Sequence, residues 1–455
     1  MKKYKQTQSL LQRHNDKFLL WAVTIFLIKI VVVLNISPVN ILVGASKTIF
    51  QVDGIWVGAD GESYVNGFYA LSNDGVFAKE RSLNYWPAAY PLLIWFLSLL
   101  GKNHVFTSLA IIQSLIFSVS IYFFAKTLIR TGLRNLTYII FLLILLNPTL
   151  SLSSLVIGYE SLTASGFIVM FTIIIKDLLE KNNKYFLQYL IFNSLTASAM
   201  IAFQFRFFFS ASLLLIAWLL IRERNRLTIY FVVLSLFLSL LAPGFLIFRN
   251  NTATGLTTIS TNLGQAMNAG AGDQATGGYL QNKGGVKCNL SGGVLDQDKQ
   301  LVRCVLNWYL DNPKKGTELF INKSAYFWSP WSGPLASGTM LRNPWLKVNP
   351  VENIKETKEG YSLVYGSVGK VVSWMWVLVG IGLLIFGFIN LWRQNSLTRV
   401  IGLLSIMVIC VNWLLIYAVT GDNRFRLPIL GLILMLQGVG FGAISKGKNA
   451  FRFDT

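Results

Sequence analysis

Long apolar runs recur along this chain from residue 18 to residue 444, and they limit the folds that it can adopt. A helix of about 20 apolar residues crosses the roughly 30 Å hydrocarbon core of a bilayer. Only 13% of the residues are charged, whereas a soluble protein carries about 25%. The sequence therefore predicts an all-α polytopic membrane protein. We expect about ten spans, at residues 18–36, 104–125, 136–155, 161–175, 185–203, 207–221, 227–248, 371–391, 400–418 and 427–444.

The net charge of +20 is the second constraint. Such an excess would suggest a nucleic-acid partner in a soluble chain, but in a membrane protein Lys and Arg gather in cytoplasmic loops and set the orientation. Residues 1–17 carry five basic side chains against one acid, and with this tail inside, every loop assigned to the cytoplasm is net positive. We therefore expect a multi-pass protein of the plasma membrane, with both termini cytoplasmic and no nucleic-acid partner.

One apolar run, at residues 90–101, is too short to be a span. At 1.5 Å per residue, its 12 residues do not cross the hydrocarbon core. We interpret it as an interfacial or re-entrant helix, with Pro91 in its first turn and Gly101 at its end. This interpretation keeps the basic cluster that follows residue 125 on the cytoplasmic side.

The predicted topology divides the chain into five parts. They are a cytoplasmic tail at 1–17, a transmembrane module at 18–248 with an external loop at 37–103, an external segment at 249–368, C-terminal transmembrane helices at 369–445 and a tail at 446–455. We expect the external segment to be small and loop-rich. Its Cys288 and Cys304 would form a disulfide if the segment is exported, and would be ordinary thiols otherwise. Metal-ligand spacing is absent and His14 and His104 are the only histidines, so we predict no metal site.

The first external loop contains the candidate catalytic acid. Apolar side chains at helical spacing after residue 61, followed by Gly75, predict a short amphipathic helix on the membrane surface. Asp60 stands just before this helix and Glu62 lies in its first turn. Asp60 has two compatible interpretations, as the N-cap of the helix and as a general base at the water–membrane boundary. In the first interpretation, Glu62 simply suits the helix dipole.

Other charged residues fall at the predicted outer ends of spans. Glu160 follows an apolar stretch, and it is either an interfacial acid in contact with water or a functional group. Four arginines have the same placement: Arg206, Arg249, Arg424 and Arg426. Headgroup snorkelling explains one or two such residues. Four of them, at the depth of Asp60 and Glu160, indicate an anion site, because the guanidinium fork suits phosphate. The Asn147-Pro148 pair predicts a kinked helix with local polar satisfaction.

These residues resemble those of the GT-C glycosyltransferases, in the branch of the protein O-mannosyltransferases and the lipid A aminoarabinose transferase. The resemblance covers most of the chain in the family's order. It rests on Asp60-x3-Tyr64 followed by Gly75 and WPAAYPLLIWFLSLLG, on LNPTLSLSSLVIGYESL, on APGFLIFRNNTATGLTTISTNLGQAMNAG and on GDNRFRLP. The ordered set is more specific than any of its members.

The resemblance implies a GT-C-type bundle whose first external loop carries juxtamembrane helices. It also implies an enzyme that takes a sugar from a polyprenyl-phosphate carrier on the outer face of the membrane, by inverting displacement. Asp60 would be the catalytic base and the four arginines would hold the donor phosphate. Glu160 would orient the acceptor, with binding of a divalent cation as the alternative and no other cofactor expected. Residues carried by the same stretches would line the donor and acceptor pocket: Glu62, Tyr64, Tyr90 and Asn262.

The chain departs from the family in ways that leave its acceptor open. Asp60 and Glu62 are separated, whereas the O-mannosyltransferases have adjacent acids, and the large C-terminal domain of the lipid A enzyme has no counterpart. The acceptor is therefore a glycan, a lipid or a protein. Two rival functions remain: an oligosaccharide polymerase or ligase that uses a diphosphate-linked lipid, and a transporter or flippase of lipid-linked sugars. A transporter predicts ionisable residues at mid-membrane, where we place only Lys29.

Overall fold

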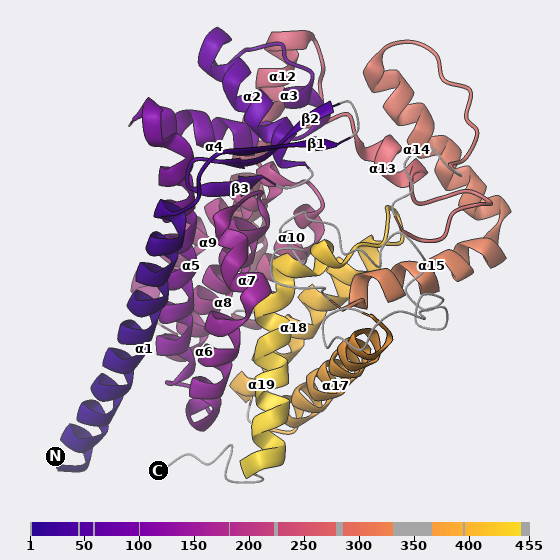
Figure 1. The fold of residues 1–455 in the computed structure, drawn as a ribbon. Coiled ribbons are helices and arrows are strands. Elements are labelled where there is room, and N and C mark those ends of the chain that lie inside the picture. Colours follow the sequence, from indigo (N-terminus) through magenta and orange to yellow (C-terminus); the bar gives the residue numbers. More distant parts are fainter. Residues whose placement is uncertain are drawn as a thin grey trace.

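The computed structural model describes residues 2–43, 46–57, 60–99, 101–181, 183–222, 226–278, 285–330, 366–394 and 396–446. This part of the chain is mostly helical, as predicted, and forms a bundle. A small sheet and several short helices lie at one end of it, which we call the elaborated end (Figure 1). The first and last described residues lie at the opposite end of the bundle in this view. The first helices of the bundle are α1 (Lys2–Leu34), α5 (Val105–Leu128), α6 (Thr137–Leu146), α7 (Pro148–Leu152), α8 (Glu160–Glu180), α9 (Asn183–Phe203) and α10 (Phe207–Arg222). The later ones are α11 (Arg226–Ser239), α12 (Leu241–Thr254), α17 (Gly366–Trp392), α18 (Ser396–Leu415) and α19 (Leu430–Lys446).

The described residues contain eight helices that are long and apolar enough to cross a membrane. Helices α6 and α7 form one further bent span, and α10 is a shorter apolar helix of 16 residues. Each predicted span overlaps one of these eight helices, the bent pair or α10. The run predicted at 161–175 is longer than expected, since α8 covers 21 residues, whereas α10 is as short as the sequence indicates. The chain is therefore a multi-pass membrane protein.

The bend between α6 and α7 measures 52° and lies at Asn147-Pro148, as predicted. Pro148 has no backbone N–H and occupies the first turn of α7. The Asn147 side chain accepts a hydrogen bond of 2.9 Å from the backbone N–H of Leu150, so it caps the helix that begins after the bend. The kink thus leaves the Leu150 N–H with a hydrogen-bond partner from the same stretch of chain.

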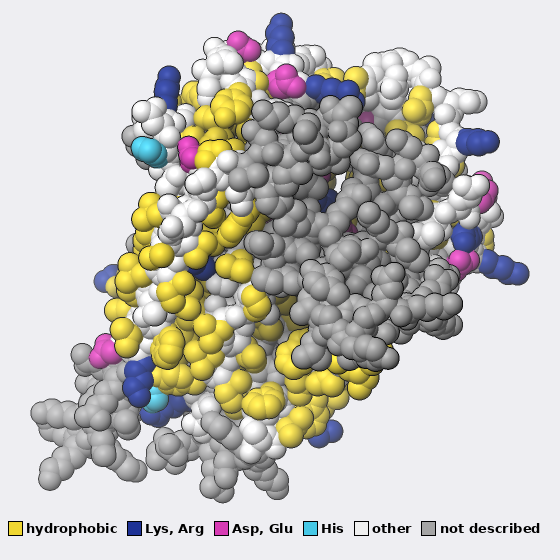
Figure 2. All heavy atoms as spheres, viewed as in Figure 1, with side chains coloured by type: hydrophobic (Ala, Val, Ile, Leu, Met, Phe, Trp, Pro, Cys, Tyr) yellow, Lys and Arg dark blue, Asp and Glu magenta, His cyan; other side chains and the backbone are white. Residues whose placement is uncertain are grey.

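Hydrophobic side chains cover the flank of the bundle. Figure 2 shows them as a broad band, with Lys, Arg, Asp and Glu side chains gathered mainly at its upper and lower ends. The band includes strongly exposed side chains such as Leu20 (65%) on α1 and Trp376 (77%) on α17. A surface that leaves such side chains exposed suits lipid rather than water. Inside the bundle, α8 packs between α5 and α9, and its Phe167 is fully buried.

A small sheet at the elaborated end was not predicted. We expected only juxtamembrane helices in the external loop at 37–103, but its first part forms strands β1 (Val39–Val43), β2 (Ser46–Val52) and β3 (Ile55–Val57). The strand order is β1-β2-β3-β4, where β4 (Val156–Ile157) comes from the stretch before α8. The first two pairings are antiparallel, and β3 pairs with β4 in parallel. The loop is therefore tied to the start of α8.

The predicted juxtamembrane helices follow this sheet. They are α2 (Gly61–Asp74), the short α3 (Ser82–Tyr85) and α4 (Ala89–Ser98), with α4 in place of the apolar run that we judged too short to span. Gly75 ends α2 with φ of +77°, a conformation that favours glycine, and its N–H bonds to Leu71 O. Tyr64, Val65, Phe68 and Leu71 form the buried face of α2. Tyr69, on the same helix, is 49% exposed.

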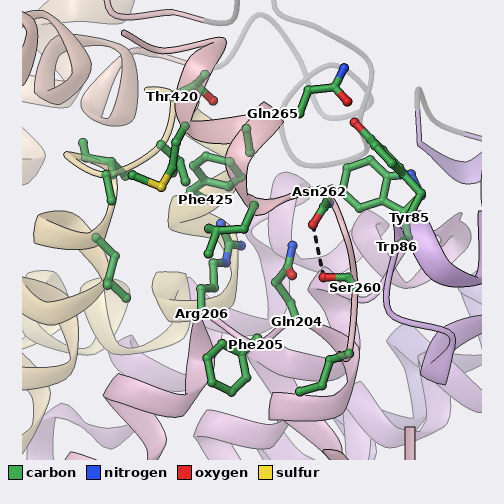
Figure 3. Close-up of a pocket in the computed structure, with 18 of the residues that line it drawn as sticks. Tyr85, Trp86, Gln204, Phe205, Arg206, Ser260, Asn262, Gln265, Thr420 and Phe425 are labelled. Carbon is green, nitrogen blue, oxygen red and sulfur yellow. Dashed lines mark hydrogen bonds between the residues drawn. The ribbon is translucent and has the colours of Figure 1, made fainter. Parts of the chain in front are cut away.

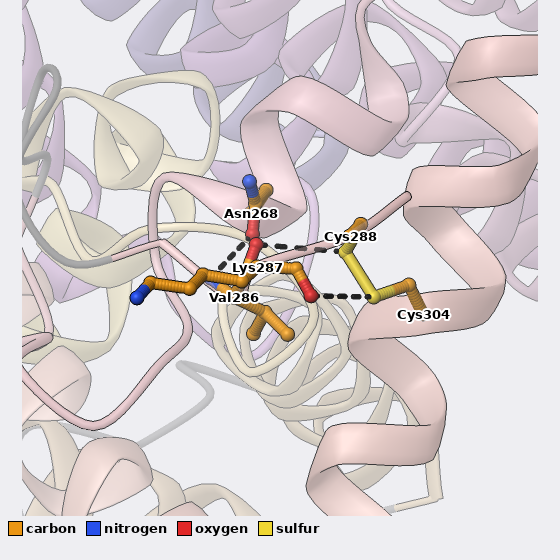
Figure 4. Close-up of a disulfide and its surroundings, with 5 residues drawn as sticks. All are labelled: Asn268, Val286, Lys287, Cys288 and Cys304. Atoms are coloured by element: carbon orange, nitrogen blue, oxygen red, sulfur yellow. Dashed lines mark hydrogen bonds between the residues drawn. A yellow bond between two sulfur atoms is a disulfide. The ribbon is translucent and has the colours of Figure 1, made fainter. Parts of the chain in front are cut away.

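The external segment contributes α13 (Leu263–Asn268), α14 (Val294–Asp311) and α15 (Pro313–Trp328). Cys288 and Cys304 form the disulfide that an exported segment would carry, and it ties α14 to the stretch before it (Figure 4). Val286, in that stretch, donates its N–H to Asn268 Oδ1 at 2.8 Å, so the same stretch is fastened to α13. Residues 331–365, the last part of this predicted segment apart from the start of α17, lie outside the described residues.

Candidate active site

The parallel pairing of β3 with β4 brings two acids to one place. Trp56 pairs with Val156 and Val57 with Ile157, so the two strands end side by side. Asp60 comes three residues after the end of β3, and Glu160 three residues after the end of β4. Each acid stands at the start of a helix, because α2 begins at Gly61 and α8 begins at Glu160 itself. The two acids, 100 residues apart in the chain, are thus brought close enough to interact electrostatically, although only Asp60 lines the cavity.

Asp60 forms an ion pair with Arg424. Its Oδ2 accepts a hydrogen bond of 2.5 Å from Nη1 of Arg424, and both side chains are about one-fifth exposed (22% and 21%). Arg424 belongs to the 3-10 helix η5 (Asn423–Ile429), which leads into α19. Asp422 accepts a hydrogen bond from the backbone N–H of Arg424 at 2.9 Å and lies 3.7 Å from its Nε. Arg424 is thus placed between two carboxylates.

The expected capping role of Asp60 is wrong. Asp60 does precede α2, but its side chain makes no capping hydrogen bond. Its backbone is already helical (φ −92°, ψ −9°), whereas a capping residue is normally extended so that its side chain can fold back on the first turn. The ion pair with Arg424, not the helix terminus, therefore holds the Asp60 carboxylate in position.

Glu160 is the second acid of the site. It is 2% exposed, and its Oε1 has no hydrogen-bond partner among the residues that the structure describes. Arg424, Arg206 and Asp60 all lie close enough to interact with it electrostatically. A buried carboxylate oxygen without a hydrogen-bond partner is costly, so Glu160 Oε1 is a candidate for contact with a ligand.

Tyr90 supports the turn before Glu160 instead of lining a pocket. Its hydroxyl accepts a hydrogen bond from the N–H of Gly158 at 3.0 Å and donates one to Gln113 Oε1 at 3.0 Å. Gln113 in turn donates to the Ser154 carbonyl at 3.2 Å. These buried contacts join α4, α5 and the β4 region, and they fix the position from which Glu160 projects.

Arg206 lies in the turn between α9 and α10 and points into the same site (Figure 3). Its guanidinium carbon is 4.2 Å from the ring centre of Phe425, 4.9 Å from Phe207 and 5.8 Å from Tyr159. Among the described residues, its buried Nε and Nη2 have no hydrogen-bond partner. Burial lowers the pKa of Arg206 from its ordinary value, but an arginine keeps its proton at neutral pH. The side chain is therefore a cation that packs on aromatic rings and has N–H donors without partners among the described residues.

The other two arginines do not belong to the site. Arg249 is fully buried, and it donates to the carbonyl oxygens of Val76 (3.0 Å) and Ala78 and to the side-chain oxygen of Asn84 (3.2 Å). Its donors are thus used by the loop that leads to α3. Arg426 points away from Arg424 and donates to the Ser329 carbonyl at the end of α15, at 3.1 Å. Neither guanidinium lines the cavity into which Arg206 and Arg424 point.

Of the remaining predicted pocket residues, one lines the cavity and two do not. Asn262 lines the cavity and is 8% exposed. Tyr64 is buried and does not line the cavity. Its ring centre lies 5.1 Å from that of Tyr90, and its hydroxyl has no hydrogen-bond partner among the described residues. Burial, with Tyr159 and the nearby acids, raises the pKa of Tyr64 well above its ordinary value, so the hydroxyl stays protonated. Glu62 lies in the first turn of α2, as predicted, but does not line the cavity.

The cavity between these groups has a volume of about 670 Å³. Two parts of its wall were not predicted. One is the aromatic pair Tyr85 and Trp86 at the end of α3. The pair lies in the stretch LNYWPAAYP, where adjacent aromatic residues before a proline were an available signal. The other is Phe425 with Asp422, inside the GDNRFR stretch whose arginines alone were singled out.

One side of the cavity opens on apolar side chains of the bundle. Phe205, in the turn before α10, is 41% exposed. Phe209 on α10 is 50% exposed and Ile247 on α12 is 38% exposed. Both helices belong to the membrane bundle, so this side faces the region in which lipid chains lie. The cavity thus combines a charged interior with an apolar side opening. Such a shape suits an amphiphile with a polar head and a hydrocarbon chain.

No protein-family model matches this chain, and no curated protein matches it either. The resemblance described above therefore rests on the quoted residues alone. Among the described residues, no group of three or more His, Cys, Asp or Glu side chains is arranged to hold a metal ion. Chemically, the site offers a carboxylate for proton transfer and two guanidinium groups for an anion, beside an apolar opening.

Proposed function

We propose that this protein is a membrane glycosyltransferase that moves a sugar from a polyprenyl-phosphate carrier to an acceptor. The observation that carries the proposal is the Asp60–Arg424 ion pair, which stands beside Arg206 in a cavity that opens toward the membrane. This reaction needs a proton acceptor, two groups that bind the donor phosphate and an apolar channel for the lipid chain. The polyprenyl chain would leave the cavity over Phe209 and Ile247.

The reaction is a single displacement at the anomeric carbon. Asp60 takes the proton of an acceptor hydroxyl while its oxygen forms a bond to the anomeric carbon. The bond between that carbon and the phosphate oxygen breaks, and the phosphate leaves with the electron pair. Arg206 and Arg424 stabilise the charge that develops on the leaving phosphate, which is usually the largest single contribution to catalysis of this kind.

The two arginines have unequal roles in this proposal. Arg424 already faces the carboxylates of Asp60 and Asp422, whereas Arg206 faces aromatic rings and keeps unpaired donors. Arg206 is therefore the first contact of an incoming phosphate. A phosphate that also reaches Arg424 competes with Asp60 for the guanidinium, which frees the carboxylate to act as a base when the donor is bound. Glu160 lies behind this group, where it orients the acceptor or, as the alternative, binds a divalent cation.

We also propose that the site faces the outside of the plasma membrane. The Cys288–Cys304 disulfide supports this orientation, because stable disulfides are typical of oxidising compartments. The excess of Lys and Arg in the loops at the other end of the bundle supports it independently. The acceptor is then a molecule of the cell surface.

The binding of undecaprenyl phosphate tests the proposal. We would measure it by native mass spectrometry on the full chain in nanodiscs, for the wild type and for Arg206→Gln. We expect at least a tenfold loss of affinity in Arg206→Gln, because a charge-assisted pair with phosphate is removed. The control is Arg130→Gln, a half-exposed arginine that pairs with Glu180 after the end of α5. Equal affinity in wild type and Arg206→Gln would contradict the proposal. Preference for undecaprenyl diphosphate over the monophosphate would favour the polymerase or ligase.

A further inference from the structure

One wall of the cavity is not used by the chemistry proposed above. It consists of Tyr85 and Trp86 from the end of α3, and of Ser260, Asn262 and Gln265 from the chain around the start of α13. Figure 3 shows the two rings and Asn262 on one side of the cavity, and Phe425 with Arg206 on the other. The wall carries no charged side chain among these five residues. It therefore suits a neutral polar ligand.

Asn262 offers a side-chain amide to the cavity. The residue is 8% exposed, and its Oδ1 accepts a hydrogen bond from Ser260 Oγ at 3.2 Å. Among the described residues, its Nδ2 donates to none. The Nδ2 donors are therefore available to a ligand in the cavity. Gln265, on the next turn, offers a second amide that makes no hydrogen bond within the described residues.

The wall is rigid before any ligand arrives. The Asn84 carbonyl, directly before Tyr85, accepts from the N–H of Thr261 at 2.9 Å. Arg249 holds the same loop through Asn84, and Asn250 donates to the carbonyls of Thr258 (2.7 Å) and Ile259 (3.1 Å). These buried hydrogen bonds fasten the loop with the two rings to the stretch with Asn262. A site fixed in this way loses little entropy when it binds.

Aromatic rings beside amides are the groups that recognise a sugar ring. The electron-rich face of Trp or Tyr attracts the polarised C–H groups on one face of a pyranose, and amides exchange hydrogen bonds with its hydroxyls. A phosphate would need cations, which this wall lacks, and a hydrocarbon chain would leave Asn262 without partners. Trp86 also packs against Tyr64, one turn of α2 beyond Asp60, so the wall lies beside the candidate base.

We propose that the Tyr85–Trp86 wall binds the acceptor, and that the acceptor is a carbohydrate. The inference rests on the proposed function, in which the leaving phosphate lies at Arg206 and Arg424. A single displacement requires the attacking hydroxyl on the opposite side of the anomeric carbon from that phosphate, and the wall lies on that side of the cavity. The hydroxyl of the bound sugar gives its proton to Asp60, its oxygen bonds to the anomeric carbon, and the phosphate leaves with the electron pair.

Saturation-transfer NMR on the full chain in nanodiscs tests this inference. The probes are the methyl glycosides of glucose, galactose, mannose, N-acetylglucosamine and rhamnose, with linear sorbitol as the control polyol. We expect transfer to the ring protons of at least one glycoside, at least a fivefold loss of signal in Trp86→Ala and Asn262→Ala, and retention in Trp86→Phe. Phe77→Ala is the matched control, because Phe77 is exposed in the same loop and packs on Phe248 outside the cavity.

Three results would overturn the inference. One is that no glycoside binds, or that binding survives Trp86→Ala. Another is that a Ser- and Thr-containing peptide displaces the glycoside, which would make the acceptor a protein. The third is that glucose 1-phosphate or mannose 1-phosphate displaces it, which would assign the ring site to the donor. Undecaprenyl phosphate binding, measured on the same variants, separates this inference from the proposed function. If the lipid binds to wild type and Trp86→Ala alike while no glycoside binds, only the acceptor assignment fails.

Discussion

Arg249 and Arg206 are both arginines near the ends of membrane helices, but their guanidinium groups face different partners. Arg249 is enclosed by carbonyl and amide oxygens of the loop before α3 and of Asn250. Arg206 rests on the rings of Phe425 and Phe207, with its spare donors directed into a cavity. The first side chain holds the protein together, whereas the second is available to a ligand. The residue type alone could not distinguish these two situations, because partners this far apart in the chain decide them.

Replacement of each of these arginines by methionine should separate the two roles. Arg249→Met leaves several buried carbonyl oxygens without partners, and each costs about 1–3 kcal/mol. We expect its melting temperature in detergent, measured by tryptophan fluorescence, to fall by more than 8 °C. Arg206→Met removes no protein hydrogen bond that the structure shows, so its melting temperature should remain within about 3 °C of wild type. A loss in Arg206→Met as large as in Arg249→Met would contradict the assignment.

Tyr90 acts on Glu160 through the backbone. Tyr90→Phe removes the acceptor of the Gly158 N–H and the donor to Gln113, so the turn before Glu160 becomes less fixed. We expect the rate of sugar transfer to fall about tenfold while the affinity for undecaprenyl phosphate is unchanged, since a small misplacement of a catalytic group lowers the rate in this range. Tyr69→Phe is the control, because Tyr69 is exposed on α2. Equal losses in both variants would mean that Tyr90 has no positioning role.

At the scale of elements, the parallel pairing of β3 and β4 is the contact that assembles the site. The two strands are three and two residues long, and they have no periodic pattern that could be detected in the sequence. The membrane helices, by contrast, were predictable because each apolar run carries its own signal. Helix α2 and its stop at Gly75 were also predictable from local pattern. The pairing of Val57 with Ile157, and with it the meeting of Asp60 and Glu160, depends on contacts across 100 residues.

Lys323 fastens α15 to the turn that leads to η5. The side chain is fully buried, and its Nζ donates to the Tyr309 hydroxyl and to the Tyr417 carbonyl, each at 2.8 Å. Burial lowers the pKa of Lys323 to about 7, whereas the unfolded chain has a lysine pKa of about 10.4. Between these two values the unfolded state binds a proton that the folded state does not. The free energy of unfolding therefore rises with pH between about 7 and 10. Below about pH 7 the contribution of Lys323 no longer changes and is at its most destabilising.

Melting temperatures between pH 6 and pH 9 test this linkage. We expect the melting temperature of the wild type to rise above pH 7. The melting temperature of Lys323→Met should rise less, because the titrating group has been removed. Lys314→Met, at an exposed position of the same helix, should keep the wild-type profile. An unchanged slope in Lys323→Met would show that the buried amine does not titrate in this range.

At the scale of the whole molecule, a bundle of membrane helices carries a polar end that holds the cavity. The fold class was predictable from hydropathy, and Asp60, Arg206, Arg424 and Asn262, which the sequence predicted to share a site, line one cavity. The aromatic wall was not predicted, because Tyr85 and Trp86 are ordinary interfacial residues until the stretch with Asn262 packs beside them. Arg426 was misassigned because it lies two residues from Arg424 in a 3-10 helix, where the two side chains point in different directions.

The disulfide allows the orientation of the whole molecule to be measured. On intact cells, a membrane-impermeant maleimide should label Cys288 and Cys304 only after treatment with an impermeant phosphine reductant, because the disulfide lies at the polar end of the bundle. Cys410, which lies within α18, should stay unlabelled until the membrane is dissolved. Labelling of Cys288 and Cys304 only in lysed cells would place the cavity on the cytoplasmic side.

The most direct test of the central claim is the transfer activity of Asp60→Asn. Asparagine can still accept a hydrogen bond from Arg424, but it cannot take a proton from an acceptor hydroxyl. In membranes supplied with labelled polyprenyl-phosphate sugar, we expect transfer to surface glycans to fall by a factor of about 10² to 10⁴. Undecaprenyl phosphate should still bind, and Asp74→Asn, at the exposed far end of α2, should remain active. Transfer near the wild-type rate by correctly inserted Asp60→Asn would contradict the assignment of Asp60 as the base.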